Sequence, residues 1–255
     1  MIKHEKKLRA NDSGQLLIVA ALAIALLISS TTIYVYELSG ERNEDTSSFS
    51  DFVLSLKQTT QNAMISSLAN ISNGGVKSVL ASDLNEFSQA LANLRSGIYH
   101  LEFTLKNDSQ YDSGVWLSWN ISGSGVSSVY SNFTLTVQTE TSKMTMPYAV
   151  NITTAVAING SYAALGGGEK LVSLTCRVYN EGKPALARSI TVFYENLGGW
   201  TQANSSNNLA IEDYDDGTYG VSFIVNTASD TVNASVHVFD LRGVYVQANV
   251  TCSSV

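Results

Sequence analysis

The sequence has few of the residues that usually build catalytic or metal-binding sites. Its 255 residues include three histidines and two cysteines, and these are not grouped with Asp or Glu at the spacing of a metal site. No phosphate-binding loop and no pairing of a nucleophile with a base stands out in the sequence. The composition therefore predicts a protein that is not an enzyme and that needs neither a metal ion nor a cofactor.

Charged residues are also scarce, and those of positive sign are the scarcer. They make up 15% of the chain, against about 25% in an average soluble protein. Acidic residues outnumber basic ones by 22 to 15, so the net charge is −7. Because nucleic-acid phosphates require a basic patch, we do not expect a nucleic-acid partner. With two prolines, the chain has no proline-rich linker.

One long apolar run stands near the N-terminus. Leu16–Tyr36 comprises 21 residues without a charge, and a helix of about this length spans the roughly 30 Å of hydrocarbon in a bilayer. Basic residues predominate before the run and acidic residues after it, so the positive-inside rule places the N-terminus in the cytoplasm. We predict a cytoplasmic segment (1–14), a transmembrane helix in the lipid bilayer (15–36), a linker (37–48) and an extracellular remainder.

Two other interpretations of the apolar run are a buried helix of a soluble protein and a cleaved secretory signal. A secretory signal has a shorter apolar region that ends at a small-x-small site. The length of the run and its flanking charges favour a membrane anchor at the plasma membrane over both.

The residues around Gly14 and Gln15 add a more specific interpretation. A basic stretch followed by these two residues and a long apolar helix resembles the class III signal of archaeal pilin-like proteins. In that family a prepilin-type peptidase cuts after the glycine and leaves the apolar helix on the mature protein. The resemblance implies cleavage between Gly14 and Gln15 and contact between like subunits through residues 15–36. Ser13 and Val19 differ from the residues that the family prefers at these positions.

Two helices and a sheet are predicted after the linker. Apolar residues recur at helical steps from Phe49 to Ile71 and from Val76 to Leu94, with "NGG" between them. From Tyr99 to Ile158 the pattern changes to the alternation of four antiparallel strands. We predict an α+β membrane-proximal domain over 49–158, with its helices packed on the four-stranded sheet. This plan is similar to that of type IV pilin heads, and an α+β domain unrelated to pilins has the same pattern.

A second run of short alternating strands fills residues 159–255 and predicts an all-β, immunoglobulin-like sandwich. Within it, "DDGTY" resembles the D-x-G-x-Y tyrosine corner of such domains, with Asp215, Gly217 and Tyr219 as the matching residues. The resemblance implies that the tyrosine hydroxyl caps backbone groups at a strand corner. Val221 stands where immunoglobulins have a cysteine.

Cys176 and Cys252 both fall on the apolar phase of their predicted strands. Outside the cell they are candidates for a disulfide, which would stabilise the fold by about 4 kcal/mol in the chain-entropy model. The alternative is two separate buried thiols.

Asn-x-Ser/Thr sequons, the acceptors of N-glycosylation, are frequent. Their density supports export to the cell surface, although outward strand positions rich in Asn and Thr would give the same pattern. The candidate extracellular acceptors are Asn70, Asn107, Asn120, Asn132, Asn151, Asn159, Asn204, Asn233 and Asn249.

The sequence thus predicts a single-pass surface glycoprotein with a structural or adhesive function, either a pilin-like filament subunit or a surface display module. The alternative is a monomeric cell-envelope ectodomain that does not polymerise. A third possibility, an anchored hydrolase, requires an acidic or histidine-bearing pocket shared by distant strands.

Overall fold

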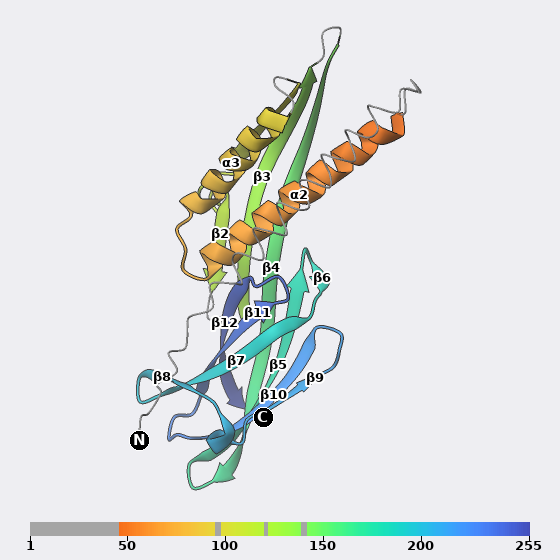
Figure 1. Ribbon diagram of the computed structural model, residues 1–255. Coiled ribbons are helices and arrows are strands. Elements are labelled where there is room, and N and C mark those ends of the chain that lie inside the picture. The colour runs from red at the N-terminus through yellow and green to blue at the C-terminus, as the bar shows by residue number, and fades with distance from the viewer. Residues whose placement is uncertain (1–45, 95–97, 120–121, 139–141) are drawn as a thin grey trace, which may run out of the picture. The chain divides into compact units, whose positions relative to one another are not determined.

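The computed structural model describes residues 46–94, 98–119, 122–138 and 142–255. Val53–Val255 form one compact unit. Its described residues are rich in β-strands, with two α-helices and one short 3₁₀ helix (Figure 1). The elements are α2 (Thr46–Ser72), α3 (Ser78–Leu94), β1 (Tyr99–Leu105), β2 (Val115–Trp119), β3 (Ser124–Gln138), β4 (Lys143–Gly166), β5 (Glu169–Asn180), β6 (Lys183–Pro184), β7 (Ala187–Asn196), β8 (Gly199–Gln202), η1 (Ser205–Asn207), β9 (Ala210–Asp213), β10 (Thr218–Asn226), β11 (Val232–Asp240) and β12 (Tyr245–Ser254).

The two predicted helices are confirmed as α2 and α3. The chain leaves α2 at Gly74, whose φ of +97° lies in the left-handed region that favours glycine. The two helices are joined by the Ser67 hydroxyl, which donates to a carboxylate oxygen of Asp83 at 2.6 Å. Their buried apolar residues follow the predicted helical steps, with Leu68, Leu80 and others almost inaccessible to solvent.

Among the described residues, eight strands follow one hydrogen-bonded path in the order β8-β7-β11-β12-β4-β5-β10-β9. Neighbouring strands on this path are antiparallel except β12 and β4, which are parallel where Ser253 and Ser254 meet Ser161 and Tyr162. The strands on both sides of this parallel pairing contribute to one shared core. The buried residues of this core include Val156, Ile158, Tyr162, Val172, Leu174, Val178, Val192, Tyr194, Tyr219, Val221, Phe223, Val236, Val238 and Val246.

β4 is unusually long and takes part in two regions of the molecule (Figure 1). Its first part, from Lys143 to Ala157, pairs with β3. Its second part, from Thr154 to Gly166, pairs with β5. The predicted domain boundary between residues 158 and 159 therefore falls inside a continuous strand, and the two predicted domains, 49–158 and 159–255, share that strand.

The prediction of helices packed on a separate four-stranded sheet is wrong. β1 and β2 pair one after the other with the same edge of β3, along Ser131–Val137 and Gly125–Val129, because β4 occupies the other edge. The region is therefore three strands wide, and it continues through β4 into the remaining strands. The helices contact this shared sheet: the Ser88 hydroxyl donates to the Leu101 carbonyl of β1, and Thr60 bonds to the Tyr148 hydroxyl of β4 at 3.1 Å.

In the part of the chain that the structure describes, no helix has a stretch long and apolar enough to cross a bilayer. The predicted transmembrane helix (15–36) and the cytoplasmic segment (1–14) lie outside the described residues.

The backbones of β3 and β12 approach closely at Gly125. A Cβ atom at Gly125 would lie 1.9 Å from the Gln247 carbonyl oxygen. Next to it, the Gly123 N–H donates to the Asn249 carbonyl at 2.9 Å.

We therefore expect Gly125→Ala to destabilise the protein by about 1–3 kcal/mol, as overpacking does. The measurement is urea unfolding of the full chain in detergent micelles, followed by circular dichroism. Gly199→Ala is the control, because its new Cβ would have only its own turn within 3.8 Å. Equal stability of the two variants would contradict the close approach of β3 and β12.

Candidate functional site

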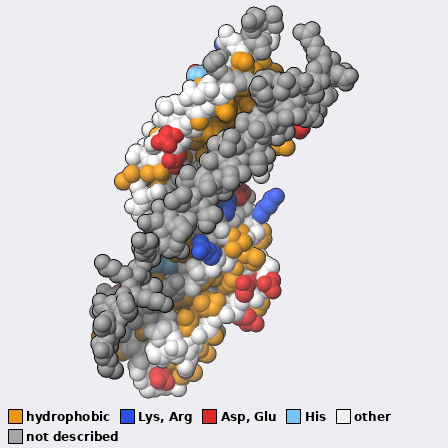
Figure 2. Space-filling view, in the orientation of Figure 1, with side chains coloured by type: hydrophobic (Ala, Val, Ile, Leu, Met, Phe, Trp, Pro, Cys, Tyr) orange, Lys and Arg blue, Asp and Glu red, His pale blue; other side chains and the backbone are white. Residues whose placement is uncertain are grey.

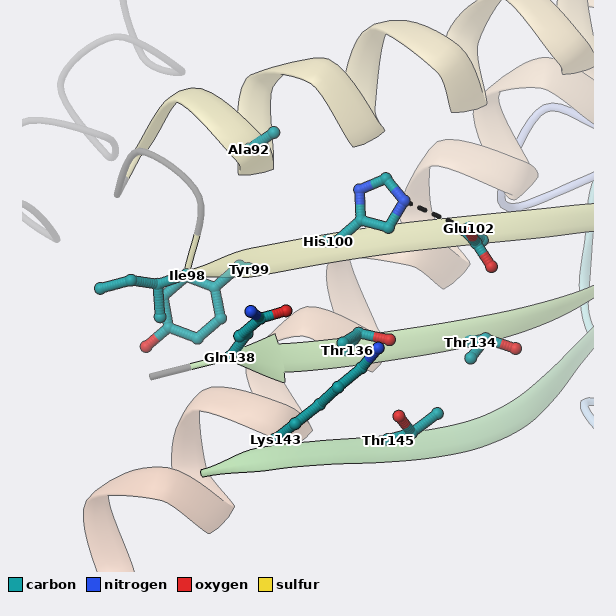
Figure 3. Close-up of a pocket in the computed structure, with 10 residues that line it drawn as sticks. All are labelled: Ala92, Ile98, Tyr99, His100, Glu102, Thr134, Thr136, Gln138, Lys143 and Thr145. Atoms are coloured by element: carbon teal, nitrogen blue, oxygen red, sulfur yellow. Dashed lines mark hydrogen bonds and ion pairs between the residues drawn. The ribbon is translucent and has the colours of Figure 1, made fainter. Parts of the chain in front are cut away.

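A shallow hollow of about 540 Å³ lies over the ends of β1, β3 and β4 (Figure 3). An ion pair within it joins the His100 Nε2 to a Glu102 oxygen of the same strand at 3.3 Å, and both side chains are well exposed. An exposed pair of this kind lacks the desolvation that prepares groups for acid–base catalysis. The hollow is lined by Ala92, Ile98, Tyr99, His100, Glu102, Thr134, Thr136, Gln138, Lys143 and Thr145.

Metal-binding groups are not gathered in the described part of the chain. No set of three His, Cys, Asp or Glu side chains among the described residues is placed to hold an ion. The notable polar chemistry lies instead in the turn between β11 and β12 (residues 240–245), which we call the β11–β12 turn.

Asp240 is the buried centre of that turn, with a side chain that is 0% exposed. Its carboxylate accepts hydrogen bonds from the Arg242 Nε and from the Thr154 hydroxyl of β4, both at 2.8 Å. The N–H groups of Arg242 and Val244 donate to the other carboxylate oxygen at 2.8 and 2.9 Å. A buried carboxylate needs such a full set of donors, so Asp240 fixes both the shape of the turn and its place against β4.

Arg242 extends this network to the β5–β6 connection and adds further hydrogen bonds to β4. Its Nη1 donates to Glu181, between β5 and β6, at 2.8 Å, and its Nη2 donates to the Thr153 carbonyl and the Thr154 hydroxyl of β4. Burial disfavours the charged guanidinium, but the hydrogen bonds that it donates to Glu181 and Asp240 outweigh this effect and raise the pKa of Arg242. The guanidinium therefore stays charged throughout the physiological pH range.

The same turn also contacts α2 and β3. The Tyr245 N–H donates to the Ser72 hydroxyl at 3.0 Å, and the Asn73 amide donates to the Gly243 carbonyl at 3.1 Å. On the other side, the Ser127 hydroxyl donates to the Tyr245 carbonyl at 2.6 Å. One short turn thus connects α2, β3, β4 and the β5–β6 connection.

The D-x-G-x-Y residues lie at the connection between β9 and β10. Tyr219 is buried, and its hydroxyl accepts a hydrogen bond from the Ala187 N–H at the start of β7, at 2.7 Å. Gly217 has a φ of +83°, and a Cβ atom there would lie 2.8 Å from the Ala185 carbonyl oxygen. Asp215, with a φ of +59°, donates its N–H to Asp213 at 2.8 Å. The Tyr219 hydroxyl thus connects β10 to the backbone at the start of β7.

The surroundings of this motif are acidic. Acidic side chains gather near β9 on the face drawn in Figure 2. Burial raises the pKa of Tyr219, so its hydroxyl stays protonated at physiological pH.

Cys176 and Cys252 are two free, buried thiols, so the predicted disulfide is not present. In the strand order, β4 lies between β5 and β12, which carry them. Two strand spacings, about 10 Å, exceed the roughly 7 Å between Cα atoms that a disulfide can bridge. Burial raises the pKa of Cys176 to about 12 and that of Cys252 to about 11, so neither thiol is a reactive nucleophile.

The predicted glycosylation acceptors lie at the surface in two groups, apart from Asn120, which is outside the described residues. Two are half-buried: Asn233 on β11 and Asn249 on β12. The exposed acceptors are Asn70, Asn107, Asn132, Asn151, Asn159 and Asn204. The predicted cleavage residues Gly14 and Gln15 also lie outside the described residues.

The network around Asp240 and Arg242 was not among the predicted sites. Its signal in the sequence is "DLRG", two opposite charges followed by a glycine between alternating apolar runs. This signal predicts a turn, but it does not predict that the aspartate is buried.

No protein-family model, curated protein or solved structure matches this chain. The proposed function therefore rests on the sequence and the geometry of the chain itself.

Removing the positive charge from the β11–β12 turn should be strongly destabilising. We expect Arg242→Met to lower the free energy of unfolding by about 3–5 kcal/mol, because it leaves the Asp240 carboxylate buried without its cation. Lys77→Met is the control, since Lys77 and its partner Asp112 form an exposed pair at 2.7 Å and such pairs contribute about 0–1 kcal/mol. Urea unfolding compares the two, and an equal effect would contradict a structural role of the network.

Removing the Tyr219 hydroxyl should also destabilise the fold. Tyr219→Phe leaves the Ala187 N–H without its acceptor, and we expect a loss of about 1–3 kcal/mol. Tyr214→Phe is the control, because Tyr214 is 52% exposed and an exposed substitution changes stability by about 0.5 kcal/mol or less. The midpoint of thermal unfolding measures the stability of both variants. An unchanged midpoint for Tyr219→Phe would contradict a stabilising hydrogen bond between the Ala187 N–H and the Tyr219 hydroxyl.

Proposed function

We propose that this chain is a membrane-anchored surface protein with a structural or adhesive function, either a pilin-like filament subunit or a display module. The observation that carries the proposal is the network of the β11–β12 turn. It ties α2, β3, β4 and the β5–β6 connection to β11 and β12, as a protein that presents a fixed surface requires. The proposal includes no catalytic activity, and the shallow, exposed character of the hollow on β1, β3 and β4 supports this.

The strand order supports the immunoglobulin-like character of the C-terminal strands. The order β4-β5-β10-β9 corresponds to strands A, B, E and D of a constant-type immunoglobulin sheet, and β7-β11-β12 corresponds to strands C, F and G. The shared core between the two groups is the core of a sandwich. The D-x-G-x-Y motif precedes β10, in the place of strand E, whereas antibody domains have their tyrosine corner before strand F.

Surface exposure supports glycosylation at some sequons more than at others. The six exposed acceptors have room for a glycan. Asn233 and Asn249 are half-buried, and their side-chain amides are engaged with neighbours on the same strands and on β7. We therefore assign the glycans to the exposed group.

The mature N-terminus distinguishes the two forms of the proposal. In a host that supplies a prepilin-type peptidase, we expect mass spectrometry of the membrane-extracted protein to find Gln15 as the first residue, because the peptidase cuts after Gly14. Gly14→Val is the control that should keep Met1.

An intact Met1 in a protein that resists alkaline extraction from membranes would contradict the filament route and favour a monomeric anchored ectodomain. Release of the protein by alkaline extraction would contradict the anchor itself.

A further inference from the structure

The outer face of β7, β11 and β12, which points away from the shared core, carries a continuous series of ring contacts. Phe193 lies 4.5 Å from His237 between ring centroids, and His237 lies 5.6 Å from Tyr245. Tyr245 also contacts Phe239 at 5.2 Å and Trp119 of β2 at 5.0 Å. We call these five residues the aromatic stripe.

The stripe is distinct from the core beneath it. Its rings alternate along the strands with Val192, Val236 and Val246, which are 0% exposed and belong to the core cluster. The stripe residues themselves are partly buried, and Trp119 also packs against the core cluster. The other four rings lie on the outer side of the sheet and are left over after the core is complete.

The face around the stripe is poor in charge. Among the described residues that strand register places on it, Glu195 is the one ionised residue, since desolvation lowers the pKa of His237 and keeps the ring neutral near pH 7. Aromatic enrichment with depletion of charge is the composition of the centre of a protein–protein interface. Register places on this face Ser189, Thr191, Phe193, Glu195, Asn233, Ser235, His237, Phe239, Tyr245, Gln247, Asn249 and Thr251.

Hydrogen bonds hold the side chains of this face in place. The Ser235 hydroxyl, only 1% exposed, accepts from the Gln247 amide at 3.2 Å and lies 3.1 Å from the His237 Nε2. The Tyr245 hydroxyl bonds to the His237 Nδ1 at 3.0 Å and to Gln247 at 3.1 Å. A face ordered in advance loses less side-chain entropy when it binds.

The two sequons on this face are poorly placed to carry glycans. The Asn233 amide donates to Glu195 at 2.7 Å, and its carbonyl accepts from the Thr251 hydroxyl at 2.7 Å. The Asn249 carbonyl accepts from Gln247 at 3.1 Å. The six exposed acceptors belong to other elements of the fold or to its loops, so glycans there would leave the stripe open.

We propose that the aromatic stripe docks onto the same face of a second copy of this chain. Two copies with a net charge of −7 each repel one another, and a charge-poor face is where they can approach. The inference rests on the proposed function, because chains anchored in one membrane meet at a high effective concentration. The contact is isologous, with a two-fold axis near His237.

The size of the face predicts the strength of the contact. The three strands, with four outward residues each, cover about 380 Å². The two copies together would bury about 760 Å², which is below the roughly 1,200 Å² of a standard interface and in the range of weak, transient contacts. The dimer is therefore weak and depends on concentration, and membrane anchoring compensates for that weakness.

Cross-linking of the full chain in detergent micelles tests the proposal. Thr191→Cys places a thiol opposite His237 in the register of β7 and β11, and Thr175→Cys places one at an exposed position on β5 as a matched control. The native thiols are buried and do not compete for a short bis-maleimide. We expect Thr191→Cys to give at least several-fold more cross-linked dimer than Thr175→Cys.

Charge variants complete the test. In the Thr191→Cys background, Phe193→Glu should abolish the cross-link, and Trp200→Glu, at a 51% exposed position beside Glu195, should weaken it at least several-fold without harm to the fold. Tyr214→Glu, at a 52% exposed position outside the stripe, should leave it unchanged.

Equal cross-linking of Thr191→Cys and Thr175→Cys would overturn the proposal, as would a cross-link that persists in both the Phe193→Glu and the Trp200→Glu variants. A dimer that sediments without a Thr191→Cys cross-link would place the contact elsewhere and likewise overturn it. Failure of the proposed function appears separately, as release of the protein from membranes by alkaline extraction.

Discussion

The pairing of buried Asp240 with Arg242 is the interaction on which the arrangement of this chain depends. An ionised carboxylate is expensive to bury unless donors surround it. The donors of Asp240 come from its own turn and from Thr154 of β4. The carboxylate therefore has all these hydrogen bonds only while the turn lies against β4. Because Arg242 also binds Glu181 and the Thr153 carbonyl, displacing the turn would break bonds to several elements together.

The turn and β4 together connect the helix-bearing strands to the C-terminal strands. β4 passes from the helix-bearing strands into the C-terminal strands without a break, and the β11–β12 turn joins the same regions from the other side. A linker between two domains would allow independent motion. A shared strand and a buried ionic network instead favour one fixed orientation of the regions that they join, which suits the structural function proposed above.

The sequence predicted the local structure better than the connections between elements. Alternation correctly indicated which residues of β5 face the core, from Val172 to Val178, because a period of two depends only on neighbours along the chain. It missed that β1 and β2 share one edge of β3, since periodicity does not specify strand partners. The apolar phase of Cys176 likewise predicted burial but not its neighbours, and no turn signal marks the passage of β4 between regions.

Scanning calorimetry of the full chain in detergent micelles tests the central claim most directly. The claim is that the helices, the helix-bearing strands and the C-terminal strands unfold as one cooperative unit. The Asp240–Arg242 network and the continuity of β4 predict a single unfolding transition for residues 53–255 in which the calorimetric and van't Hoff enthalpies agree. Two separated transitions, one for the helix-bearing strands and one for the C-terminal strands, would contradict it.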